Sequence, residues 1–90
     1  MGTLEFYVGE KKYVDAIVRT KDEKDLVIIN RASWEIYENP EAKPITGSCF
    51  VSGDKVSALI ETNKKGNFIL KFIVEIGSET IIEKIALRVS

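Results

Sequence analysis

Hydrophobic and polar positions alternate with a period of two along the last third of the chain, over residues 66–89. In the first arm, Phe68, Leu70, Phe72 and Val74 alternate with Ile69, Lys71, Ile73 and Glu75. In the second arm, Ile81, Ile85, Leu87 and Val89 share one face, and Ile82, Lys84, Ala86 and Arg88 share the other. Gly77-Ser78 lies between the arms, so the pattern predicts a β-hairpin with one face in a core.

The same period recurs in the rest of the chain, and no segment has a convincing helical repeat. It predicts strands over residues 3–8, 10–20, 26–29, 33–38, 45–51 and 55–61. The charged run 21–25, the loop 39–44 that holds both prolines, and the turns at 52–54 and 63–66 separate them. Seven to eight short antiparallel strands describe an all-β fold of one domain, residues 1–90, and favour a β-sandwich over a barrel. We expect Trp34, Phe68 and Phe72 to fill the space between the sheets.

Composition narrows the class of function. The chain has 90 residues and a formal net charge of −1, and its lysines are scattered, so we expect no nucleic-acid partner. No apolar run approaches the roughly 18 residues of a membrane span, and the first residues do not read as a signal peptide, so we expect no membrane partner.

Candidate chemistry is sparse. Histidine is absent, which removes the usual general base. The single cysteine, Cys49, supports neither an internal disulfide nor a zinc site and is expected to be an unreactive thiol. Four carboxylates, Asp15, Asp22, Glu23 and Asp25, could ligate calcium, but their spacing matches no known calcium loop and a solvated charged turn is the preferred interpretation. The glycines are isolated, so no phosphate-binding loop is present. We therefore expect neither an enzyme nor a cofactor.

Several local patterns resemble immunoglobulin-like sandwich modules of phage and prophage structural proteins, such as the N-terminal domains of baseplate proteins. They are Tyr7-Val8-Gly9-Glu10-Lys11-Lys12-Tyr13-Val14, Ala32-Ser33-Trp34-Glu35-Ile36, Gly47, Ser52-Gly53-Asp54-Lys55 and Lys65-Gly66-Asn67-Phe68-Ile69-Leu70. The resemblance covers nearly the whole chain. It implies an immunoglobulin-like sandwich that works as a non-catalytic assembly protein, located in a virion or in the bacterial cytoplasm.

The outward face of the final hairpin carries more apolar residues than a solvated face needs. Ile69, Ile73 and Ile82 point outward if Phe68, Leu70 and Phe72 point inward, and they form a candidate protein interface with Lys71 and Lys84 as polar neighbours. The expected partners are proteins, a second copy of the chain included.

Two other classes of function remain open. Clustering of Tyr7, Tyr13 and Tyr37 on one exposed face would favour an adhesion or carbohydrate-binding module. A deep pocket with two facing glutamates would favour an enzyme, and an inhibitor would use the loop 39–44.

Overall fold

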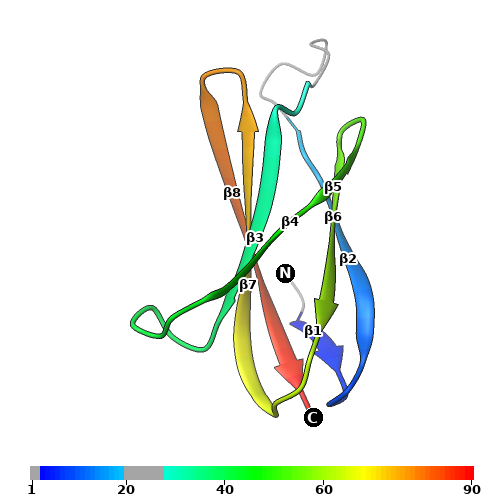
Figure 1. Cartoon of the computed structure of the whole chain (residues 1–90), viewed down its shortest axis with the longest axis vertical. Helices are drawn as coiled ribbons and strands as arrows, with labels where there is room; N and C mark the ends of the chain where they lie inside the picture. The colour runs from blue at the N-terminus through cyan, green and yellow to red at the C-terminus, as the bar shows by residue number, and fades with distance from the viewer. Residues whose placement is uncertain (1–2, 20–27) are drawn as a thin grey trace.

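The structure is a computed structural model that describes residues 3–19 and 28–90. Every regular element in this part of the chain is a strand (Figure 1). The strands are β1 (Thr3–Phe6), β2 (Lys11–Ile17), β3 (Arg31–Tyr37), β4 (Ile45–Ser48), β5 (Phe50–Ser52), β6 (Lys55–Glu61), β7 (Gly66–Ile76) and β8 (Glu79–Val89). The predicted all-β class is therefore confirmed.

The strands form two sheets that face each other as a sandwich (Figure 1). The larger sheet has the order β1-β8-β7-β3-β4, and the smaller has the order β2-β6-β5. Every neighbouring pair is antiparallel except β1 and β8, which run parallel. The expectation of a wholly antiparallel fold is wrong at this one pair, because β1 joins the strand farthest from it in sequence rather than β2.

The hairpin predicted over residues 66–89 is confirmed. β7 and β8 pair along their full length, from Gly66↔Val89 to Ile76↔Glu79. Gly77 has a φ of 58°, whereas Ser78 has a negative φ, as in a type II′ turn. The backbone N–H of Gly77 also donates to Asn30 Oδ1 at 3.3 Å, which fixes the turn beside the start of β3.

The strand expected over residues 45–51 is two strands in different sheets. β4 pairs with β3, and β5 pairs with β6. The chain changes sheets at Cys49, whose backbone N–H donates to the Ala32 carbonyl at 3.0 Å. Only β5 therefore forms a hairpin with β6, around the predicted turn at 52–54, where Gly53 has a φ of 62°.

Other strand boundaries also differ from the expectation. Strands β1 and β2 are shorter than predicted, and β3 begins earlier, at Arg31. Ile28 and Ile29 are not in a strand, and the rest of the predicted strand 26–29, together with the charged turn 21–25, lies outside the described residues.

The core lies between the sheets and draws on both of them. Its buried hydrophobic residues are Phe6, Val14, Val18, Ala32, Val56, Ala58, Ile60, Leu70, Phe72, Val74, Leu87 and Val89. Phe72 is fully buried as predicted, whereas Trp34 and Phe68 are half-buried and pack against the core. Phe6 is the large core residue that the sequence did not single out.

Trp34 lies against the backbone of β4. Gly47 is its cross-strand partner, and a Cβ at position 47 would come within 2.5 Å of Trp34 Cζ2. A glycine is therefore needed at this point for the indole to lie this close to the neighbouring strand.

Candidate functional site

The five residues of the predicted interface lie together on the outer face of the larger sheet. Ile73 is directly opposite Ile82, and Lys71 is directly opposite Lys84. Ile69 follows on the same face, opposite Ala86. The period of the hairpin thus predicts their grouping, since residues paired across two strands share a face.

These side chains differ in exposure. Ile82 is 50% exposed, whereas Ile69, Ile73 and Lys71 are half-buried. The exposed apolar surface on this face is therefore smaller than the sequence suggested, and Ile82 is the most exposed of the three isoleucines.

A row of charges crosses the face between the isoleucines. Glu35 pairs in register with Lys71, and Lys71 Nζ lies 3.9 Å from Glu35 Oε2. Lys84 stands opposite Lys71 on the next strand, where two like charges repel. No ion pair of Lys84 is found among the described residues, and its side chain is exposed.

The loop between β3 and β4 rises beside this row and makes a hollow of about 300 Å³. Its lining comprises Glu35, Tyr37, Pro40, Ala42, Pro44, Lys71 and Lys84. The loop is shaped by Asn39, whose Oδ1 accepts the backbone N–H groups of Glu41 and Ala42, both at 3.0 Å. The hollow is large enough for one side chain of a partner and carries two lysines and one glutamate.

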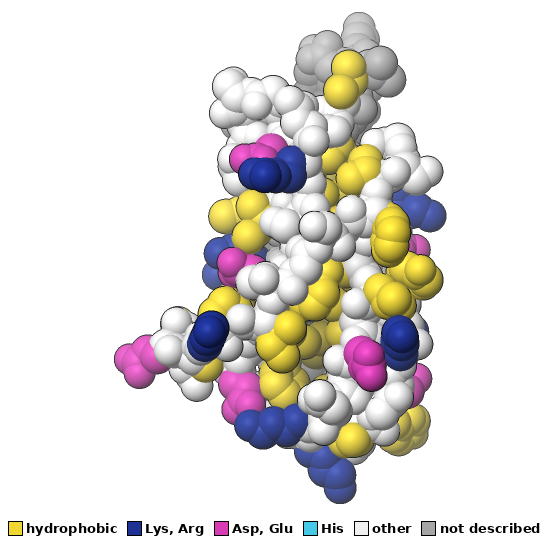
Figure 2. All heavy atoms as spheres, in the orientation of Figure 1, with side chains coloured by type: hydrophobic (Ala, Val, Ile, Leu, Met, Phe, Trp, Pro, Cys, Tyr) yellow, Lys and Arg dark blue, Asp and Glu magenta, His cyan; other side chains and the backbone are white. Residues whose placement is uncertain are grey.

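A second apolar surface, not predicted from the sequence, lies on the outer face of the smaller sheet. Tyr13 and Phe50 meet edge to face with ring centroids 6.0 Å apart, and they are 58% and 61% exposed. Ile17, at 55% exposed, shares the face, and Leu59 is the cross-strand partner of Tyr13. Figure 2 shows hydrophobic side chains gathered along the side of the molecule where β2, β5 and β6 lie. We call Tyr13, Ile17, Phe50 and Leu59 the aromatic patch.

The change of sheet at Cys49 explains why the aromatic patch was missed. Phe50 reaches Tyr13 only because β5 joins β6, which in turn pairs with β2. In the sequence, the alternation within residues 10–20 already places Tyr13 and Ile17 on one face, and that within 55–61 places Leu59 outward, but neither pattern brings Phe50 to them.

The three tyrosines do not form one platform. Tyr13 lies on the outer face of the smaller sheet, and Tyr37 is half-buried on the outer face of the larger one. Tyr7, at 72% exposed, follows the end of β1. Because β2 and β3 belong to different sheets, the arrangement that would favour a carbohydrate-binding module is absent from these residues.

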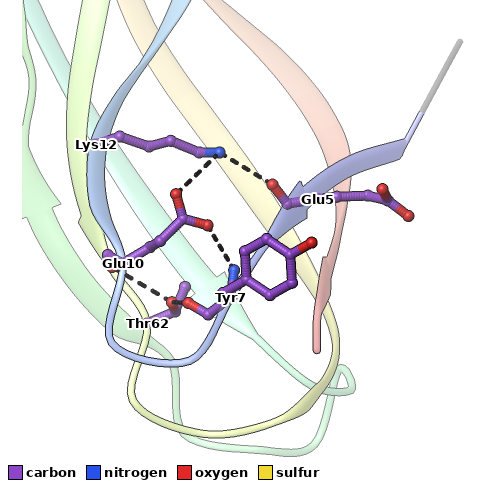
Figure 3. A network of polar contacts seen from close by, with 5 residues as sticks. All are labelled: Glu5, Tyr7, Glu10, Lys12 and Thr62. Carbon is purple, nitrogen blue, oxygen red and sulfur yellow. Dashed lines mark hydrogen bonds and ion pairs between the residues drawn. The ribbon is translucent and has the colours of Figure 1, made fainter.

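A polar network closes the end of the sandwich where β1 meets β2 (Figure 3). Lys12 Nζ donates to the Glu5 carbonyl at 3.0 Å and lies 3.7 Å from Glu10 Oε2. The Tyr7 backbone N–H donates to Glu10 Oε1 at 2.6 Å, and the Thr62 hydroxyl donates to the Tyr7 carbonyl at 2.9 Å. Thr62 is the one buried polar side chain among the described residues, and these contacts occupy the outer edge of β1.

The remaining candidate residues are Cys49 and the carboxylates considered for calcium. Burial raises the pKa of the half-buried Cys49 thiol to about 11, which favours the neutral form at pH 7. Of the four carboxylates considered for calcium, only Asp15 lies in the described part, where no cluster of metal-ligating side chains occurs. Within residues 3–19 and 28–90 there is also no helix of the length and apolarity needed to span a membrane.

No protein-family model matches the chain, and neither a curated protein nor a solved structure is significantly similar to it.

Proposed function

We propose that the chain is an immunoglobulin-like β-sandwich that has no catalytic role and binds a protein partner through the outer face of its larger sheet. The strand order supports the fold. Immunoglobulin sandwiches place strands A, B, E and D in one sheet and C, F and G in the other, with C′ beside C in the variable type. In the same order along the chain, β2, β6 and β5 correspond to B, E and D, and β3, β7, β8 and β4 correspond to C, F, G and C′. The first strand, β1, departs from this pattern because it joins β8 in the second sheet.

The position of the tryptophan adds to this support. Immunoglobulin domains carry a buried Trp on strand C, and Trp34 lies on β3, the corresponding strand. Antibody domains pack this residue against a disulfide, which a chain with one cysteine cannot form internally. Here the large side chain next to Trp34 is Phe72, its cross-strand partner on β7, in place of a disulfide.

The observation that carries the binding proposal is the exposed Ile82 beside the ammonium of Lys84. A partner would cover Ile82 and Ile73 with an apolar residue and direct a carboxylate at Lys84 in the hollow under the 39–44 loop. An ammonium that gains a desolvated carboxylate partner gives the contact its orientation and specificity.

The test is affinity capture from the cells that produce the protein, with the wild type and two variants. Ile82→Lys places a charge in the proposed contact, and Ile17→Lys places one at a similarly exposed isoleucine on the other sheet. We expect a partner that the wild type and Ile17→Lys retain and that Ile82→Lys loses. Equal retention by all three proteins, or loss with Ile17→Lys alone, would contradict the proposed surface.

A role in a phage or prophage particle is the assembly context that the sequence resemblance favours, and we include it in the proposal. The genes beside the coding gene give a direct test. Neighbours that encode capsid, portal or tail proteins would support this context, and a neighbourhood of metabolic genes would count against it.

A further inference from the structure

The edges of the two sheets differ in how open they are. β4 and β5, at one side of the sandwich, have only four and three residues. β1, at the other side, has four residues, and its outer edge is occupied by the side chains of Lys12, Glu10 and Thr62. β2 has seven residues, contains no proline, and has no strand on its outer side among the described residues. It is the longest open edge in this part of the molecule.

The backbone groups at that edge can be assigned from the pairing with β6. In an antiparallel pair, hydrogen-bonded and non-hydrogen-bonded residue pairs alternate. The N–H of Val18 donates to the Asp54 carbonyl at 2.8 Å, and the N–H of Thr62 donates to the Glu10 carbonyl at 3.0 Å, so even-numbered residues of this stretch bond to β6. Lys11, Tyr13, Asp15 and Ile17 therefore direct their N–H and C=O groups away from β6, where a further strand would accept and donate.

The charges along this edge are arranged so that one copy of the edge complements a second copy. In the segment Lys11-Lys12-Tyr13-Val14-Asp15, a positive and a negative residue stand at equal distances on either side of Tyr13. We propose that β2 pairs antiparallel with β2 of a second copy of this chain, about a two-fold axis at Tyr13, so that two three-stranded sheets become one continuous sheet. Lys11 of each copy then faces Asp15 of the other, and Tyr13 faces its own symmetry mate.

Charge selects this register over its neighbours. With the axis at Asp15, the two Asp15 carboxylates would oppose each other, and like charges directly opposite are destabilising. With the axis between Tyr13 and Asp15, Lys11 would face Ile17 and Tyr13 would face Asp15, so neither charge would gain a partner. Only the register centred on Tyr13 gives two cross-strand pairs of opposite sign while every outward backbone group of Lys11, Tyr13 and Asp15 finds its complement.

The aromatic patch adds apolar area to the same contact. Tyr13 is the residue at the axis, and its ring already leans on Phe50 from β5. Two such pairs brought together by the two-fold axis cover tyrosine surface that is 58% exposed in the single copy. This dimer uses the smaller sheet and leaves the outer face of the larger sheet free, so it does not depend on the function proposed above.

A charge-swap experiment tests both the dimer and its register. Asp15→Lys and Lys11→Asp each turn the two attractive pairs into two repulsive ones, at exposed positions of β2. Sedimentation equilibrium up to about 1 mM protein should show a dimer for the wild type and a dimer at least roughly tenfold weaker for each variant alone. An equimolar mixture should form a heterodimer, because the two positive side chains of the Asp15→Lys chain then face the two carboxylates of the Lys11→Asp chain.

Lys55→Glu, a charge reversal on the same outer face but on the central strand β6, is the matched control and should dimerise like the wild type. A wild type that stays monomeric over this concentration range would overturn the proposal. So would dimerisation that neither reversal weakens, or a mixture of the two variants that stays monomeric.

Discussion

Replacement of Gly47 by alanine should destabilise the domain through Trp34. The added Cβ would lie 2.5 Å from Trp34 Cζ2, 2.6 Å from Cε2 and 2.7 Å from Nε1, well inside van der Waals contact. The indole is wedged between β4 and the core, so it can yield only by leaving its packing. Overpacking of this kind costs about 1 to 3 kcal/mol.

A smaller loss of backbone conformational entropy on folding offsets part of this destabilisation. The φ of Gly47 lies outside the left-handed region, so alanine can adopt its backbone conformation, and the loss of chain freedom on folding becomes smaller by about 0.4 to 1 kcal/mol. The expected net loss is about 1 to 2 kcal/mol. For a domain of this size, the melting temperature should fall by roughly 5 to 15 °C.

Thermal and urea unfolding followed by circular dichroism would measure the loss, with Ser48→Ala, on the same strand, as the control. The decisive comparison is the same Gly47→Ala change in a Trp34→Leu background. Leucine lacks the three ring atoms that collide, so there the change should be neutral or stabilising. An equal loss in both backgrounds, or a gain in the wild type, would refute the role assigned to the indole.

Three further predictions test other parts of the fold. Thr62→Val keeps the side-chain shape but removes the donor to the Tyr7 carbonyl, and urea unfolding should show a loss of about 1 kcal/mol; an unchanged midpoint would mean that the hydroxyl contributes nothing to closing the sandwich. Leu70→Ala empties a fully buried site and should cost about 2 to 5 kcal/mol in the same assay, whereas Ile82→Ala, half-exposed on the outer face, should cost under about 1 kcal/mol. The pKa of Cys49 is raised from 9.0 to about 11 in the folded state, so the wild type should lose stability relative to Cys49→Ala as the pH rises through that interval and not below it; parallel curves for the two proteins would show that the thiol does not titrate as described.

The part of the fold that the sequence predicted well is the part whose pairing is local. In the β7–β8 hairpin, the turn at Gly77 and the alternation on both arms fix the register. The register in turn fixes which side chains share a face, so the grouping of Ile73 with Ile82 and of Lys71 with Lys84 was predictable. Their exposure was not, because Ile69 and Ile73 lie on β7 between β3 and β8, whereas the part of β8 that holds Ile82 has a neighbouring strand on one side only.

The features that the sequence did not predict all depend on pairing between distant segments. Nothing near Thr3 indicates that β1 will lie parallel to β8, and nothing near Cys49 indicates that the chain will change sheets within one apolar run. The contact between Tyr13 and Phe50 follows from the second of these events. Strand choice of this kind is decided by which sheet buries each apolar face, and this is a property of the assembled core rather than of a local pattern.

The parallel pairing of β1 with β8 bears on how the domain would respond to mechanical tension. A pull from the start of β1 against the end of β8 would draw the two strands past each other along their lengths. The bonds from Ser90 N–H to the Phe6 carbonyl and from Val8 N–H to the Ser90 carbonyl, with the ladder from Thr3 to Phe6, would then be strained together rather than opened one at a time. Forced extension is governed by the rate of unfolding, so this short ladder, braced by Lys12 and Thr62, would set the force at which the domain gives way.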